Sequence, residues 1–386
     1  MSGRMRERTG RYRIVVNAIH ARAGGGVTYL RNLLPLLAAE PDLELHFIPP
    51  RGWKDAFGAL SPTIHVHDVA MPGRWVSVLL WEQLVLPFIV WRIGFDAVFS
   101  PANFAPLALP AQVIVIQNAV TVGRHENRIG KRVYWFTLRM MTTLSLLTVR
   151  RAIAVSQYVA DTAMPPLRHT SLSVIHHGVG AAFSPAPVAQ PFGDYLLAVG
   201  DLYIQKNLDR LIEAFSVVRR RYPAMALRIA GTAVDGEYAA ALHRRVAALD
   251  LGGAVVFAGR QTTAALVELY RGCAVFVFPS SIESFGMPLV EAMACGAPVV
   301  ASSGGAIPEI AGGAAELCDP GDAQDIAETI LRVLDDPALR RSLCERSLRR
   351  AKDFSWVDCA CRTADVLRGA ASSRVNRVAP VQPRSP

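Results

Sequence analysis

The chain has 386 residues, of which 51% are hydrophobic and 19% are charged, and this is the composition of a globular protein of two or three domains. Its formal net charge of +9 favours anionic partners, such as phosphorylated ligands, an anionic membrane surface or nucleic acid. The basic residues are dispersed and do not alternate with aromatic residues, so we expect no nucleic-acid partner.

The first half of the chain alternates short apolar runs with longer amphipathic segments, which is typical of βα units around a parallel sheet. This pattern predicts a doubly wound N-terminal domain over residues 1–185, ending in a proline-rich linker at 183–193. The predicted strands are 13–17, 43–48, 63–67, 97–99, 113–116, 152–155 and 172–175, and the predicted long helices are 27–39, 75–91 and 132–151.

The segment 76–91 is apolar over sixteen residues but carries Glu82, Gln83 and Pro87. It is shorter than the roughly 20 residues that span a bilayer. We favour a helix that faces the core, and a helix that dips into a membrane surface is the alternative.

The second half repeats the alternation and predicts a second doubly wound sheet over residues 191–355, facing the first across a central cleft. Its predicted elements include strands 195–199, 226–230, 254–257, 274–278 and 298–301, and helices 208–221, 237–249, 263–271 and 288–294, with further helices from residues 322 and 337. A helix over 356–370 is expected to cross back to the first domain, and residues 371–386 are expected to be disordered.

The cysteines and the N-terminal residues indicate the cellular compartment of the protein. The six cysteines form no Cys-x-x-Cys pair, so we expect buried, reduced thiols. The basic N-terminal residues lead only into a short apolar run at 14–16, which is not a secretory signal. We therefore expect a cytoplasmic protein, and contact with the inner face of an anionic membrane stays open.

No metal site is expected from the sequence. There is no Asp-x-Asp motif, and no histidine lies at zinc-ligand spacing from a cysteine. His65 and His67 share one strand face, where structural histidines are the favoured interpretation and metal ligands the alternative.

Two glycine positions and one lysine follow predicted strands. Gly24, Gly25 and Gly26 precede an apolar helix, where they form either a loop that approaches a phosphate or a flexible turn. Gly200 ends strand 195–199, and Lys206 lies just before helix 208–221. A lysine at a helix N-terminus opposes the helix dipole, so we consider a bound diphosphate there, with a solvated surface lysine as the alternative.

The stretch ESFGMPLVE, residues 283–291, carries two glutamates around a loop and a helix start. We expect Glu291 in the first turn after Pro288, ionised and stabilised by the helix dipole. Glu283 has no comparable structural reason, and carboxylates accept hydrogen bonds from sugar and ribose hydroxyls. The amides of Ser284, Phe285 and Gly286 are candidates to hold phosphate oxygens.

The run PSSIESFGMPLVEAMACGAPVVASSGGAIPEIAGGAA, residues 279–315, resembles the donor-site signature of the retaining group-1 (family-four) glycosyltransferases, including their E-x7-E motif. The resemblance continues in VGDLYIQKNLDRLIEAF, VVFAGRQTTAALVELY and SVIHHGVGAAFSP, and covers most of residues 10–365.

This resemblance implies the GT-B fold of two Rossmann-like domains, with the nucleotide-sugar on the C-terminal domain, the acceptor on the N-terminal domain and no metal requirement. It implies that Glu291 binds the ribose, Glu283 the donor sugar and Lys206 the diphosphate, so Lys206 and Glu283 are the expected catalytic residues. The implied donor-binding residues are Gly25, Gly26, Gly200, Lys206, Asn207, Arg260, Glu283, Ser284, Phe285, Gly286, Met287, Pro288, Leu289 and Glu291.

The chain departs from the family pattern at two places. Many relatives carry an arginine where this chain has Asp201 or Gln205, so the diphosphate would depend more on Lys206 or on Arg260. Many also place His-Asp where this chain has Gln117 and Asn118, which indicates a changed acceptor-side pocket.

These features predict a retaining glycosyltransferase that moves a hexose, with mannose as one candidate, from a UDP- or GDP-sugar to a glycan or lipid-linked acceptor in bacterial surface polysaccharide synthesis. No cofactor is expected beyond the donor substrate. The alternatives are a non-catalytic nucleotide-sugar-binding subunit, and a sugar-nucleotide epimerase or glycosidase that uses both glutamates.

Overall fold

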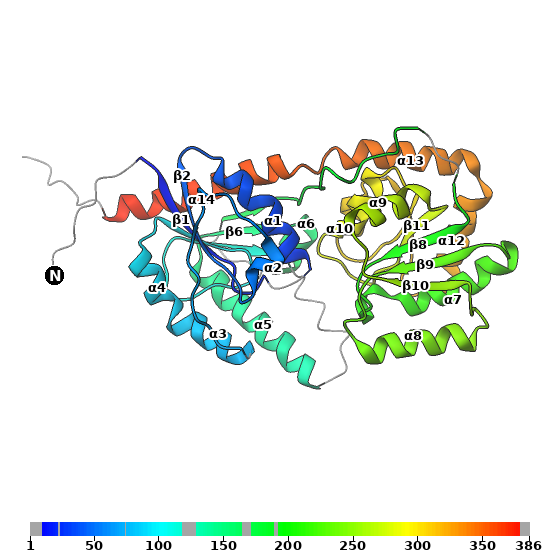
Figure 1. The fold of residues 1–386 in the computed structure, drawn as a ribbon, viewed down its shortest axis with the longest axis horizontal. Coiled ribbons are helices and arrows are strands. Elements are labelled where there is room, and N and C mark those ends of the chain that lie inside the picture. The colour runs from blue at the N-terminus through cyan, green and yellow to red at the C-terminus, as the bar shows by residue number, and fades with distance from the viewer. Residues whose placement is uncertain are drawn as a thin grey trace, which may run out of the picture. The chain divides into compact units, whose positions relative to one another are not determined.

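The structure is a computed structural model that describes residues 10–21, 24–73, 75–117, 129–163, 171–188 and 192–378. The chain divides into two compact units, each built on its own parallel sheet (Figure 1). Unit 1 comprises Met1–Val155, Val159–His176 and Trp356–Pro386, and unit 2 comprises Ser156–Tyr158 and His177–Ser355. The prediction of two doubly wound parallel sheets is confirmed.

Unit 1 contains a seven-stranded sheet in the order β3-β2-β1-β4-β5-β6-β7. Its inner strands are apolar on both faces, as expected where helices cover both sides of a parallel sheet. The strands are β1 (Tyr12–Asn17), β2 (Leu43–Ile48), β3 (His65–Val66), β4 (Ala97–Ser100), β5 (Gln112–Ile116), β6 (Arg151–Ala154) and β7 (Ser171–Val174). The helices are α1 (Gly25–Ala38), α2 (Trp53–Phe57), α3 (Trp75–Leu84), α4 (Leu86–Ile93), α5 (Ile129–Thr148), α6 (Gln157–Ala163), which begins in unit 2, and α14 (Trp356–Val378).

Unit 2 contains a six-stranded sheet in the order β10-β9-β8-β11-β12-β13. One large hydrophobic core packs α7, α8 and α12 against the strands of this sheet. The strands are β8 (Tyr195–Val199), β9 (Ala226–Ala230), β10 (Val255–Gly259), β11 (Val275–Phe278), β12 (Val299–Ser302) and β13 (Ala315–Cys318). The helices are η2 (Ile204–Lys206), α7 (Leu208–Arg221), α8 (Gly236–Ala248), α9 (Thr263–Gly272), α10 (Met287–Ala294), α11 (Ile307–Ala311), α12 (Ala323–Asp335) and α13 (Pro337–Ala351).

Each sheet has one point where the strand order reverses. In unit 1 it lies between β1 and β4, and in unit 2 between β8 and β11. Open α/β sheets bind ligands outside the carboxyl ends of the strands at such a switch point. Functional side chains are therefore expected in the loops that follow β1, β4, β8 and β11.

The predicted single helix over 75–91 is wrong. The chain forms α3 and α4 instead, bent by 42° at Val85. Pro87 lies in the first turn of α4 and has no N–H to continue the hydrogen bonds of α3. In the described part of the chain no single helix is long and apolar enough to cross a membrane, and the bent α3 and α4 pair reaches that length and composition only together.

The C-terminal helix also differs from its prediction. α14 continues to Val378, so residues 371–378 are helical where disorder was expected, and residues 379–386 lie outside the described residues. Its packing explains the extension: the Tyr12 hydroxyl lies 3.0 Å from the Ser372 hydroxyl, and the Arg374 guanidinium lies 3.7 Å from the centroid of the Phe95 ring. The helix therefore belongs to unit 1.

The boundary between the units falls between residues 176 and 177, before the predicted linker at 183–193. The segment after it is bonded to unit 2, because Arg271 donates hydrogen bonds to the carbonyl oxygens of Ser184 and Pro185.

Candidate functional site

Lys206 and Glu283 meet at the switch point of unit 2. Lys206 ends η2 after β8, and Glu283 lies in the loop between β11 and α10. The Lys206 Nζ lies 2.6 Å from Glu283 Oε1, and only 17% and 12% of these side chains are exposed. The sequence predicts both residues after strand ends, and the structure joins them in one ion pair.

Two glycines make room for the lysine. A Cβ on Gly200 would lie 3.2 Å from the Cδ and Cε atoms of Lys206, so a side chain there would displace the lysine stem. A Cβ on Gly231 would lie 2.0 Å from the carbonyl oxygen of Gly200, which makes glycine necessary at that position. Gly231 was not singled out by the sequence analysis, although a glycine directly after a strand is the same signal as Gly200.

The loop that carries Glu283 is held on two sides. On one side, the carbonyl oxygen of Gln205 accepts from the Ser281 N–H at 2.9 Å and the Ser281 hydroxyl at 3.2 Å. On the other side, Ala306 N–H donates to the Glu283 carbonyl oxygen at 2.9 Å. A Cβ on Gly305 would lie 2.4 Å from that same oxygen, so only glycine allows this approach. The backbone of Glu283 is thus fixed independently of its carboxylate.

The start of α10 follows directly from the glycine and proline in its sequence. Gly286 has φ +91°, a left-handed conformation that glycine adopts without strain, and Pro288 lies in the first helical turn. Phe285 and Leu289 are buried, and Phe285 packs edge to face against Phe354 and His177 with centroids 5.7 and 4.8 Å apart. Phe285 and Leu289 are therefore core residues. The backbone of Ser284, Phe285 and Gly286 forms the loop before α10, and the partly buried Met287 and Pro288 begin the helix.

Glu291 lies at the start of the second turn of α10, because the helix begins at Met287, one residue before the expected start at Pro288. It is partly buried, and its Oε2 accepts a hydrogen bond from the Tyr270 hydroxyl at 3.1 Å. Burial raises the pKa of Glu291 to about 7, and the hydrogen bond from Tyr270 offsets only part of that rise. The expectation that the helix dipole keeps this carboxyl fully ionised is therefore wrong, because the dipole acts within the first turn and burial acts on the whole side chain.

Two residues after β8 join loops, a role that their sequence did not predict. The Asn207 amide donates to the carbonyl oxygens of Pro279 and Pro320 at 3.0 and 2.8 Å, so its side chain ties loops together. Asp201 accepts from the Thr232 N–H at 3.0 Å and joins the loops after β8 and β9. Arg260 follows β10, is exposed, and forms no ion pair with the described part of the chain.

In unit 1, Gly25 and Gly26 form the N-terminus of α1 directly after the β1 loop. A Cβ on Gly26 would lie 3.7 Å from Oε1 of Gln117, which follows β5. The structure thus brings Gly26 and Gln117 together at the carboxyl edge of the sheet. Asn118, the other predicted acceptor-side residue, lies outside the described residues.

A buried carboxylate, which the sequence does not predict as a site residue, lies at the unit 1 switch point. Glu82 of α3 is fully buried, and its two oxygens contact Asn17 Nδ2 at 2.8 Å and His20 Nε2 at 2.9 Å. Asn17 Nδ2 also lies 3.3 Å from the hydroxyl oxygen of Ser100 at the end of β4. Glu82 therefore orients His20, whose side chain is 29% exposed, at the carboxyl end of β1.

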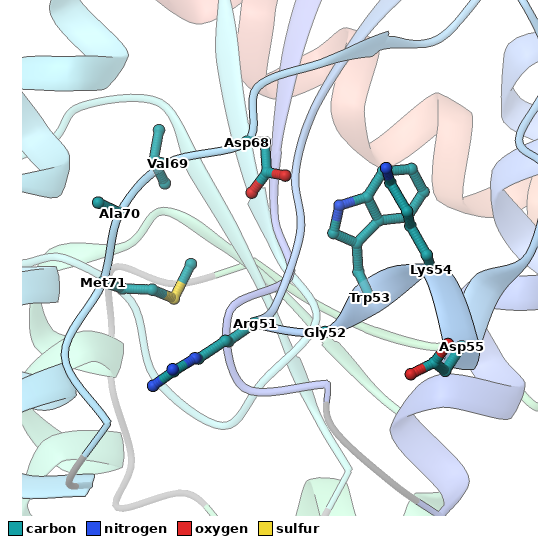
Figure 2. Close-up of a pocket in the computed structure, with 9 residues that line it drawn as sticks. All are labelled: Arg51, Gly52, Trp53, Lys54, Asp55, Asp68, Val69, Ala70 and Met71. Atoms are coloured by element: carbon teal, nitrogen blue, oxygen red, sulfur yellow. The ribbon is translucent and has the colours of Figure 1, made fainter.

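Unit 1 also contains an open pocket of about 570 Å³ beyond the carboxyl ends of β2 and β3. Figure 2 shows Asp68 projecting toward the indole ring of Trp53, with Arg51 on the side of Met71. Aromatic, carboxylate and basic groups in one open pocket suit a saccharide, since a ring can pack on the indole and hydroxyls can bond to the charged groups.

Comparisons with known proteins relate the second half of the chain to one family. The family model described as "Glycosyl transferases group 1" matches residues 189–350. The O-antigen chain mannosyltransferase B of Escherichia coli is 33% identical over 178 residues, which are 45% of this chain and 45% of that protein. The match thus spans less than half the length of this curated relative.

Solved structures resemble the chain over nearly its full length. Sucrose-phosphate synthase from Thermosynechococcus elongatus has a TM-score of 0.80 at 20% identity, over 94% of this chain and 100% of that one. Anabaena Alr3699/HepE, in complex with UDP-glucose, has a TM-score of 0.73 at 18% identity, over 93% and 100%. At these identities the likeness establishes the fold, which is the two-domain GT-B fold of glycosyltransferases.

Proposed function

We propose that the chain is a retaining hexosyltransferase of bacterial surface polysaccharide synthesis, because residues 189–350 match the model of the group-1 glycosyl transferases. The proposed donor is a UDP- or GDP-hexose, and the proposed acceptor is a glycan or lipid-linked saccharide. The observation that carries the proposal is the Lys206 and Glu283 ion pair at the switch point, with Glu291 in the helix that follows. The name of the E. coli mannosyltransferase supports mannose as the first sugar to test.

Lys206 is suited to the leaving diphosphate because of its ion pair. An ammonium group has three N–H donors, and Glu283 occupies one of them, so two remain for phosphate oxygens. The ion pair also fixes the direction of a long, flexible side chain before the donor binds. When the bond from the sugar to the diphosphate breaks, negative charge grows on the diphosphate, and a pre-oriented cation stabilises that transition state.

Glu283 and Glu291 would bind hydroxyls at the two ends of the donor. Glu283, in the loop before α10, would accept from the sugar hydroxyls, and Glu291, in the second turn of α10, would accept from the ribose hydroxyls. Pro288 has no N–H, and the Leu289 N–H donates to the Gly286 carbonyl oxygen at 3.0 Å, so the start of α10 would favour the anionic diphosphate mainly through the positive end of the helix dipole. In the proposed reaction, the bond from the sugar to the diphosphate breaks, and the acceptor hydroxyl oxygen bonds to the anomeric carbon on the face that the diphosphate leaves. The hydroxyl proton passes to the departing diphosphate, and the anomeric configuration is retained.

We propose that transfer needs no metal ion, because Lys206 and the helix N-terminus supply the positive charge. Donor turnover is then expected to persist in the presence of EDTA. A loss of turnover with EDTA that Mg²⁺ or Mn²⁺ restores would contradict this part of the proposal.

The acceptor side would be served by unit 1. The pocket with Trp53 and Asp68 is the proposed saccharide site, and the Gly26 and Gln117 contact lies at the same edge of the sheet. Trp53→Ala is expected to raise the KM for acceptor and leave donor affinity unchanged, because the pocket lies wholly in unit 1.

We also propose that unit 1 docks on the cytoplasmic face of an anionic membrane. Leu84, Phe88 and Trp91 of α3 and α4 are 75%, 68% and 52% exposed, and Phe136 and Leu147 of α5 are 69% and 57% exposed. Gln83 of α3 donates to the Ala105 carbonyl oxygen, and the Ala105 N–H donates to Ser145 of α5, so α3 and α5 are neighbours. α4 and α5 contain basic residues and no acidic ones, and the single acid of α3, Glu82, is buried. An apolar surface with positive charge fits anionic lipid.

Vesicle sedimentation tests this docking. The chain is expected to bind vesicles of phosphatidylcholine with phosphatidylglycerol, and not phosphatidylcholine alone. Phe88→Ser with Phe136→Ser should release it, whereas Val234→Ser, a matched change at a residue of unit 2 that is 58% exposed, should not. Equal binding of both vesicle types would contradict the role of charge.

The catalytic proposal is tested by thermal shift with UDP, GDP, ADP and their sugars, followed by donor turnover. One nucleotide should stabilise the wild type, and Lys206→Met and Glu283→Gln should lower turnover about 100-fold or more, the scale seen when one charge-stabilising group is removed. Lys352→Met, at an exposed lysine after α13, is the control and should change neither measurement. Donor binding with no transfer to any acceptor extract would indicate a non-catalytic binding subunit instead.

A further inference from the structure

A row of histidines lies on the edge of the unit 1 sheet. β3 pairs with β2 so that His65 is aligned with His46, and the His67 N–H continues the ladder by donating to Phe47. Glu44 precedes His46 by two residues, so both point to the same face of β2. Aligned residues of parallel strands share a face, so His65 and His67 join them. Four potential ligand side chains are therefore gathered by the register of two strands.

The polar atoms of this cluster point at one another. His46 Nε2 lies 2.8 Å and His65 Nε2 lies 4.0 Å from the same oxygen, Oε1 of Glu44. One atom from each of these three residues lies within 4.8 Å of the other two. Tetrahedral ligands about 2.0–2.1 Å from a zinc ion are roughly 3.4 Å apart, which lies between the two measured separations. The ring of His65 has room to adjust, because its side chain is 57% exposed.

His67 completes the arrangement. Its Nε2 lies 2.8 Å from His46 Nδ1, the nitrogen that faces away from Glu44. A histidine that binds metal through one nitrogen commonly donates its other N–H to a neighbouring group, which fixes the ring orientation. The rings of His65 and His67 stack against His46 at centroid distances of 4.9 and 5.1 Å. His46 is therefore held in one orientation on both sides.

One neighbouring cation competes with a metal ion for the carboxylate of Glu44. The Arg13 guanidinium contacts both oxygens of Glu44, with Nη2 3.1 Å from Oε1 and 3.4 Å from Oε2 and Nε 3.2 Å from Oε1. A metal ion must share or displace these contacts, so Arg13 is expected to weaken the site.

We propose that Glu44, His46 and His65 form a binding site for a divalent transition ion of the zinc class, with water in an open position and His67 orienting His46. Two imidazoles and one carboxylate suit zinc and its neighbours, whereas Mg²⁺ and Ca²⁺ prefer oxygen ligands alone. The ion would join the two-residue strand β3 to β2 and close the sheet edge. Glu44 and His46 lie in the body of β2, and none of the four residues lines the proposed saccharide pocket, so the site is expected to take no part in the proposed transfer.

The test is zinc titration by calorimetry into the full-length chain without a histidine tag, stripped with EDTA and dialysed. Because thiolates also bind zinc, the exposed Cys361 is replaced by Ser in every protein. We expect one zinc ion per chain, no heat with Mg²⁺, and a higher unfolding temperature with zinc. His65→Ala, at an exposed position, should lower zinc affinity at least tenfold, and His67→Phe should lower it about tenfold.

His243→Ala is the matched control, since it removes an exposed histidine of unit 2. Its zinc affinity should equal that of the parent. The proposal is overturned if the parent takes up no zinc, if His65→Ala binds zinc as tightly as the parent, or if Mg²⁺ binds equally well. Nucleotide binding, measured on the same samples, reports on the donor site separately, so failure of either proposal is distinguishable from failure of the other.

Discussion

Glu291 is the residue at which function and stability oppose each other. Burial raises the pKa of its carboxyl to about 7 from an ordinary value of 4.5, so the folded chain holds this proton more tightly than the unfolded chain. Its stabilising effect is fully present below about pH 4.5 and is lost as the pH rises through about 7. Above that pH the folded chain carries a partly buried carboxylate whose one identified hydrogen bond comes from Tyr270.

Replacing Glu291 with Gln should therefore stabilise the ligand-free protein at alkaline pH. The rise in the pKa of Glu291 corresponds to a difference of roughly 3 kcal/mol in the free energy of unfolding between variant and wild type at about pH 8, and this difference should disappear near pH 4. Thermal unfolding at both pH values measures it. Glu345→Gln, at a glutamate that is 72% exposed, should show no such pH-dependent gap. A Gln variant that is less stable at both pH values would mean that the carboxylate has partners that outweigh its burial.

The Lys206 and Glu283 pair allows a second residue-level prediction. Both side chains are more than four-fifths buried, so removing one partner leaves a charge without its partner. Lys206→Met or Glu283→Gln alone should destabilise the protein by about 3 kcal/mol, and the double variant should recover much of that loss. Urea denaturation of the three variants measures the coupling.

The matched comparison is the exposed pair of Arg221 and Asp335, whose side chains are 60% and 37% exposed at an N to O distance of 3.0 Å. Removing Arg221 should cost less than about 1 kcal/mol. Additive losses at Lys206 and Glu283 would show that the two side chains are not coupled in solution.

At the scale of elements, the loop after β12 determines where Glu283 lies. Gly305 has φ +63°, and a Cβ there would lie 2.4 Å from the Glu283 carbonyl oxygen and 2.6 Å from its nitrogen. Gly313 has φ +81°, and a Cβ there would meet nothing within 4 Å. An alanine at either position would be strained by the positive φ, but only an alanine at position 305 would also collide with the backbone of Glu283.

Gly313→Ala should therefore cost about 1–2 kcal/mol, the strain of a left-handed residue, and leave donor affinity unchanged. Gly305→Ala should destabilise the protein further and lower donor affinity, because the loop that carries Glu283 must move. Urea denaturation and nucleotide calorimetry measure both effects. Equal behaviour of the two variants would show that this loop yields freely.

The elements that the sequence predicted best are those with strong apolar patterns. β2, β8, β9 and α7 have the bounds that were predicted. Short elements were missed, among them α6, α11 and β13, because five to seven helical residues or a four-residue edge strand carry too little periodicity. The bend between α3 and α4 was missed although Pro87 was noticed, since a proline's effect depends on where in the turn it falls.

For the whole molecule, the sequence predicted which residues follow strand ends, but not which of them contact one another. Lys206 and Glu283 were each found after a strand, but their contact depends on β8 lying beside β11, which chain order does not reveal. Glu82 was seen only as a polar residue in an apolar run, and its contacts with Asn17 and His20 join residues more than sixty positions apart. Contacts of this kind are set by topology and packing, and neither has a local signal.

The division into two units, each with its own core, predicts that ligands act on them separately. In differential scanning calorimetry, nucleotide should raise the unfolding temperature of unit 2, and zinc should raise that of unit 1. A ligand at about 100 times its dissociation constant adds about 2.7 kcal/mol to the unit that binds it. Lys206→Met should abolish the first shift alone and His65→Ala the second alone. If either ligand moved one common transition, the two units would unfold as a single cooperative body, and each site would then contribute to the stability of the whole chain.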